Sequence, residues 1–134
     1  MVVNSENNID ELLNKFKELS RELYFYVSAD NSVCNPNFNY KKSIKMGKDT
    51  FKIAKKILFS SEGQTKFLEL LNDKDLIVSY CAAEYLYPLN PVKCIDIMQK
   101  LYNQTTNKID KYTIKTKIDG ISENHKFFID MYKN

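Results

Sequence analysis

Turn-forming residues are scarce in this chain, which has three glycines and three prolines among 134 residues. A β protein built from many short strands needs more of these residues for its turns. The apolar fraction of 43% and the charged fraction of 28% are typical of a soluble globular protein. A chain of this length builds one hydrophobic core. We therefore expect a single all-α domain that covers residues 1–134.

Arginine is almost absent as well. Arg21 is the only arginine, so lysine supplies 19 of the 20 basic side chains. Arginine is the residue best suited to bidentate contacts with phosphate and guanine, and its scarcity argues against sequence-specific reading of DNA. The net charge of +3 is only mildly basic. Sequence-specific DNA-binding proteins are therefore a poor match for this composition.

Catalytic signatures are also missing. His125 is the only histidine, so a zinc site based on histidine would need cysteines or carboxylates that show no recognisable spacing. The glycine-rich motifs of phosphate-binding loops and the nucleophile motif of serine hydrolases do not occur. We expect a non-enzymatic protein with no metal and no cofactor. Spacing alone leaves a Cys34–His125 dyad open as an enzymatic alternative.

Cysteine usage and the lack of long apolar runs indicate the compartment. The three cysteines are odd in number and form no C-x-x-C pair, and Cys81 and Cys94 fall in apolar helical stretches. Free thiols of this kind suit a reducing cytosol. The first residues do not resemble a signal peptide, and no apolar run approaches the ~20 residues that span a bilayer. We expect a cytoplasmic protein that does not enter a membrane.

Hydrophobic periodicity and capping residues predict a series of helices joined by short links. Asn8 is placed to cap the first helix, and a polar loop at 29–39 precedes the second. Residues 107–120 alternate like a strand but also fit helical spacing, and we favour a helix because no partner strand is evident. The expected helices are 9–27, 40–59, 64–71, 76–87, one that begins at Pro91, 107–120, and a last one after Ser122.

The segment 72–101 contains the most specific pattern. Its residues Asp75, Val78, Ala82, Ala83 and Leu86 follow the spacing D-x-x-V-x-x-x-A-A-x-x-L. This pattern resembles the inner helix of a HEAT repeat, and the preceding segment 67–71 resembles the outer helix. The resemblance implies an all-α, HEAT-like stack of six or seven antiparallel helices.

Small single-domain bacterial proteins of the HEAT-like kind include immunity proteins that are encoded beside polymorphic or contact-dependent toxins. The resemblance therefore implies a protein-binding module whose partner is a cognate toxin domain. It would neutralise that toxin by stoichiometric binding. The sequence leaves the oligomeric state and the identity of the toxin open.

A row of lysines runs along the expected helix 40–59. Lys41, Lys45, Lys48, Lys52 and Lys56 recur every three or four residues and share one side. Such a ridge attracts acidic partners at long range. Nucleic acid is the alternative partner, which we rank lower because the aromatic residues of this helix, Tyr40 and Phe51, are expected on the opposite, core-facing side.

Two further candidates lie on the expected helix 76–87. This helix is apolar around almost its whole circumference, which predicts a buried central element. Glu84 is its only charged side chain, so we expect the carboxylate either to face a cationic partner or to pair with a lysine from a neighbouring helix. The candidate partner-binding residues are Lys41, Lys45, Lys48, Lys52, Glu84 and Tyr87.

Overall fold

The computed structural model describes residues 8–121 and residue 123, and this part of the chain contains helices and no strands. The all-α prediction is confirmed there. The helices are α1 (Ile9–Tyr26), α2 (Tyr40–Leu58), α3 (Ser61–Glu69), the short 3₁₀ helix η2 (Leu70–Asn72), α4 (Leu76–Leu86), α5 (Pro91–Gln104) and α6 (Lys108–Gly120).

A polar side chain caps the start of every α-helix in this part of the chain. Each cap accepts a hydrogen bond from a backbone N–H of the first turn, which otherwise has no partner within the helix. Because a cap is recognisable in the sequence, most helix starts were predicted to within one residue. The capping residues are Asn8, Asn39, Ser60, Asp75, Asn90 and Asn107.

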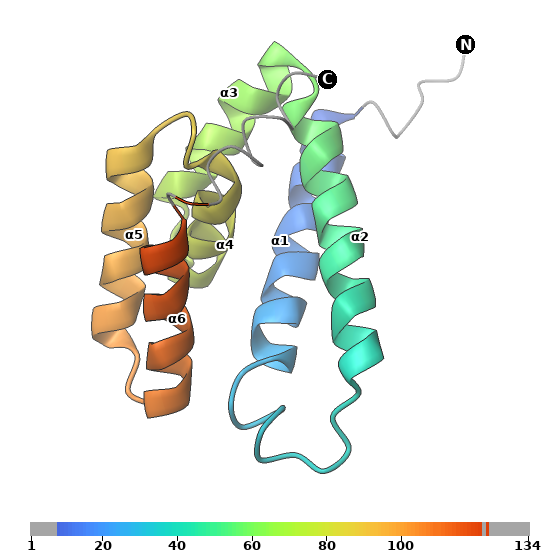
Figure 1. The fold of residues 1–134 in the computed structure, drawn as a ribbon. Helices are drawn as coiled ribbons and strands as arrows, with labels where there is room; N and C mark the ends of the chain where they lie inside the picture. Colours follow the sequence, from blue (N-terminus) through green and yellow to red (C-terminus); the bar gives the residue numbers. More distant parts are fainter. Residues whose placement is uncertain (1–7, 122, 124–134) are drawn as a thin grey trace.

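The helices form two groups that meet at one end (Figure 1). In Figure 1, α1 and α2 form an antiparallel pair on one side, while α5 and α6 lie antiparallel on the other. The central helix α4 packs against α5 and also against α1, so it joins the two groups. At the end where the two groups meet, α3 contacts α1, α2 and α4.

The core is built around α4, as its apolar sequence predicts. Phe16 of α1 meets Phe67 of α3 edge-on, with ring centroids 4.8 Å apart, and both side chains are fully buried. Ala82 and Ala83 are also fully buried. Their small side chains allow neighbouring helices to approach α4 closely. Burial of an aromatic side chain contributes about 2 kcal/mol, so these contacts hold the two groups of helices together.

The corner between α2 and α3 depends on Gly63. A Cβ atom at this position would overlap the backbone carbonyl oxygen of Ile57. The Ser60 side chain accepts a hydrogen bond from the Gly63 N–H at 3.0 Å and starts α3. We predicted that residues 60–63 end one helix and that the next helix begins at Gln64, but α3 already begins at Ser61 because Ser60 serves as its cap.

The predicted burial of Tyr40 was wrong. Tyr40 was expected on the core-facing side of α2, but its exposed fraction is 70%, and that of Ile44, one turn further along, is 41%. The buried side of α2 is instead formed by Thr50, Ile53, Ala54, Ile57 and Leu58. Val92, in the first turn of α5, is 83% exposed. Residues 108–120 form a helix, which confirms the helix that we favoured over a strand for this segment. The helix expected after Ser122 lies outside the described residues.

Candidate functional site

The exposed side of α2 concentrates positive charge. The helix has seven lysines and a single acid, Asp49. Since its apolar residues include the buried set that faces α1 and the core, the lysines are left on the solvent side. We call this side the lysine face. It consists of Lys41, Lys45, Lys48, Lys52, Lys55 and Lys56.

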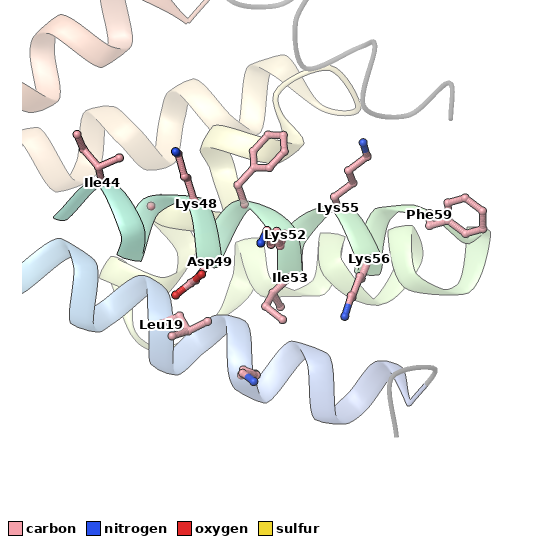
Figure 2. Close-up of a pocket in the computed structure, with 12 residues that line it drawn as sticks. Leu19, Ile44, Lys48, Asp49, Lys52, Ile53, Lys55, Lys56 and Phe59 are labelled. Atoms are coloured by element: carbon pink, nitrogen blue, oxygen red, sulfur yellow. The ribbon is translucent and has the colours of Figure 1, made fainter. Parts of the chain in front are cut away.

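A shallow groove runs along the lysine face (Figure 2). Figure 2 shows Ile44, Lys48 and Lys55 on one side of α2, with Asp49, Ile53 and Lys56 on the other. The second side faces α1, which contributes Lys15 and Leu19 to the groove. Five ammonium groups and one carboxylate line it, from Lys15, Lys48, Lys52, Lys55, Lys56 and Asp49.

Most of this charge is uncompensated within the described residues. Lys45 forms an ion pair with Asp49, with 2.8 Å between Nζ and Oδ2, and this hydrogen bond lowers the pKa of Asp49. In residues 8–121, the other five lysines of the face form no ion pair. Like charges on one helix repel one another, and an anionic partner relieves that repulsion.

Apolar groups accompany the charge. Phe59, at the end of the groove, is 74% exposed, and Ile44, at the other end, is 41% exposed. Gly47 lies between them, and a Cβ atom built at Gly47 would meet nothing within 4 Å. Glycine inside a helix costs about 1 kcal/mol relative to alanine. No contact among the described residues requires a glycine at this position.

The structure brings some of the predicted residues together and separates others. Lys48 and Lys52 line the groove, while Lys41 and Lys45 lie on the same face towards the start of α2. Glu84 and Tyr87 lie on α4 and at its end and line no part of the groove. Tyr87 is half-buried.

Glu84 pairs with a lysine from a neighbouring helix, which was one of the two arrangements expected for it. The Lys117 Nζ of α6 lies 3.0 Å from Glu84 Oε1. The negative charge of Glu84 raises the pKa of Lys117, since it stabilises the ammonium form. The Glu84 side chain is 27% exposed, so the pair remains within reach of solvent.

Sequence reasoning missed the apolar part of the groove. Phe59 follows Lys41 by 18 residues, which is five helical turns, so it falls in line with the lysines. The sequence analysis predicted Phe59 only as the last residue of the helix. Leu19 and Lys15 belong to another helix, and no local signal in the sequence places them beside α2.

A second, smaller pocket lies between α1, α4 and α6. It has a volume of about 110 Å³, and Glu84 and Lys117 are on its wall together with Tyr24, Tyr80 and Asp110. Tyr80 is only 2% exposed, and its hydroxyl has no hydrogen-bond partner in the part of the chain that the structure describes. A buried hydroxyl without a partner costs about 1–3 kcal/mol. Burial also raises the pKa of Tyr80, with a further contribution from Glu84.

The part of the chain that the structure describes shows neither a metal-binding cluster nor a membrane-crossing helix. No group of three or more His, Cys, Asp or Glu side chains within them is arranged to hold a metal ion. None of the helices described has both the length and the apolar character that a membrane crossing requires. Comparisons of the chain with protein-family models, with curated proteins and with solved structures found no match.

Proposed function

We propose that this chain is a non-enzymatic protein-binding module that uses the lysine face of α2 to bind an acidic surface of its partner. The observation that carries the proposal is the combination of uncompensated lysines with exposed apolar groups in one groove. Lysines accelerate the encounter with an acidic partner, and buried apolar area then supplies affinity. Lys48, Lys52 and Phe59 are the central contact residues.

We further propose that the partner is a toxin domain and that the protein acts as a cytoplasmic immunity protein. This step depends on the resemblance of residues 75–86 to a HEAT inner helix. The structure supports the resemblance in one respect: Asp75 caps α4, and Val78, Ala82, Ala83 and Leu86 are all buried. An arrangement of the whole chain as a HEAT-like stack is part of this proposal. Stoichiometric masking requires no cofactor.

The proposal is tested with the product of the gene immediately upstream. The two proteins are co-expressed, and co-purification at a 1:1 ratio with loss of toxicity is expected. The double variant Lys48→Glu, Lys52→Glu should weaken the complex at least about tenfold, because it places two carboxylates against an acidic surface. Lys100→Glu, Lys108→Glu is the matched control, since it changes net charge equally on exposed positions of α5 and α6.

Two outcomes would contradict this function. If the neighbouring product is an unrelated housekeeping protein and does not bind, the immunity function is rejected. If a partner binds but both double variants weaken it equally, the lysine face is not the contact surface. Circular dichroism of each variant establishes that the helices remain intact.

Nucleic acid is a second candidate partner, and one observation favours it. We expected Tyr40 and Phe51 on the core-facing side of α2, but Tyr40 is exposed, and so is Phe59, which directly follows α2. Proteins that bind single-stranded nucleic acid combine positive charge with exposed aromatic rings on which bases stack. Binding of a labelled single-stranded oligonucleotide, with a steep salt dependence that Lys48→Glu, Lys52→Glu removes, would support this alternative.

A further inference from the structure

The pocket between α1, α4 and α6 has the features of a ligand site rather than of an ordinary packing defect. Tyr24 of α1, Tyr80 and Tyr85 of α4, and Ile114 of α6 form its apolar walls. Its volume of about 110 Å³ is smaller than the roughly 150 Å³ of an apolar cavity that holds benzene. A butyl-sized group is therefore the largest that we expect it to enclose.

Two carboxylates and the buried Tyr80 hydroxyl are among the polar groups on its wall. Glu84 uses Oε1 to bind Lys117, and Asp110 uses Oδ1 to accept the Ala29 N–H at 2.8 Å. The second carboxylate oxygen of each has no partner among the described residues, and neither does the buried Tyr80 hydroxyl. These three oxygens can all accept hydrogen bonds from an N–H donor.

The net charge of the residues that line the pocket also favours a cationic ligand. Glu84 and Asp110 contribute two negative charges and Lys117 one positive charge, so one negative charge is left over. Arg21 and Lys17 of α1 pair with Asp75 and Asp73, and none of these four residues lines the pocket. Tyrosine ring faces attract cations, and the Lys117 ammonium already lies 5.8 Å from the centre of the Tyr80 ring.

We propose that this pocket binds an organic cation with a short apolar stem, an alkylammonium group. The stem packs against the rings of Tyr24 and Tyr80, and the ammonium donates to the free oxygens of Glu84 and Asp110 and to the Tyr80 hydroxyl. The group belongs either to a free amine or to a lysine side chain of a partner. The proposal does not depend on the lysine face, which belongs to a different groove.

The test is a titration of the full chain with n-butylammonium, followed by ¹H–¹⁵N correlation spectra. n-Butanol and butyrate serve as neutral and anionic probes of the same size. We expect saturable shifts confined to residues of α1, α4 and α6, with a Kd of about 1 mM. Butanol should bind at least about tenfold more weakly and butyrate not at all.

Conservative variants identify the contacts. Asp110→Asn and Glu84→Gln keep an oxygen for the Ala29 and Lys117 hydrogen bonds but remove charge, and each should weaken n-butylammonium binding about tenfold. Tyr80→Phe keeps the ring and should weaken binding about threefold. Asp96→Asn, an exposed position on α5, is the control and should change nothing.

The source of the cation is distinguished with Nα-acetyl-lysine methylamide. If this compound binds as tightly as n-butylammonium, the pocket receives a lysine side chain; if it binds at least tenfold more weakly, the ligand is a free amine. The proposal is overturned if butanol binds as well as n-butylammonium, if no probe shifts the pocket resonances at about 50 mM, or if the carboxamide variants bind like the wild type.

Discussion

Substitution of Gly47 separates the stability of this domain from its binding. Gly47 lies near the middle of α2, and a Cβ atom there would point into open space. Gly47→Ala should therefore stabilise the free protein by about 1 kcal/mol, the difference in helix propensity between the two residues. For a domain of this size, this corresponds to an increase in Tm of roughly 4 °C.

The other two glycines provide matched comparisons. Gly63→Ala should destabilise the protein by about 2–4 kcal/mol, because its Cβ atom would overlap the Ile57 carbonyl oxygen and the corner between α2 and α3 must shift. Gly120→Ala also has open space, but it ends α6, so we expect a gain of only a few tenths of a kcal/mol. Urea denaturation followed by circular dichroism measures all three values.

A large side chain at position 47 should weaken binding of the partner. Gly47→Leu keeps a good helix former and fills the middle of the groove, so the complex proposed above should weaken at least about tenfold while the free domain stays folded. A loss of stability in Gly47→Ala would refute the description of the space beside Gly47 as open. Unchanged partner binding in Gly47→Leu would refute the assignment of the groove as the contact surface.

The remaining predictions concern thiols, alkaline pH and a helix cap. Burial raises the pKa values of Cys81 and Cys94 to about 12, so at pH 8 the native protein should expose one reactive thiol, the exposed Cys34, and three after unfolding in urea; rapid reaction of more than one native thiol would contradict this burial. The pKa values of both buried thiols, of Tyr80 and of Lys117 are raised in the folded state. The unfolded chain therefore loses these protons first above about pH 9, and the free energy of unfolding should fall as pH rises beyond that value. A urea midpoint that stays constant between pH 9 and 11 would count against it. Ser60→Ala should cost about 1 kcal/mol by removing the cap of α3, whereas Ser61→Ala, its neighbour, should be nearly neutral by the same denaturation assay.

Local features of the fold were predictable because their causes are local. Asn8 and Asp75 cap their helices through atoms within three residues, and the apolar circumference of α4 required burial wherever its neighbours came from. The burial of α2 was less predictable because its lysines are flanked by two apolar stripes. One contains Ile44 and Phe51, and the other contains Ile53 and Ile57. Only tertiary packing decides which is covered, and the structure leaves Ile44 at the edge of the groove.

The candidate site also combines features that local sequence predicts with features that depend on tertiary packing. The lysine spacing was sufficient to place Lys48 and Lys52 on one exposed face. The partner of Glu84 was anticipated only as some lysine, since Lys117 is 33 residues away and belongs to another helix. The Tyr80 hydroxyl required the structure, because a missing hydrogen bond is a property of the surroundings and not of the residue.

The separation of α2 into a buried side and a lysine face has an evolutionary consequence. The residues that hold α2 in place, such as Ile53, Ala54 and Ile57, are distinct from those that face solvent. Substitutions at the exposed positions typically change stability by less than about 0.5 kcal/mol. The face can therefore change its charge and shape one residue at a time while the fold stays intact. A protein that must follow a changing partner can adapt along this helix without passing through unstable intermediates.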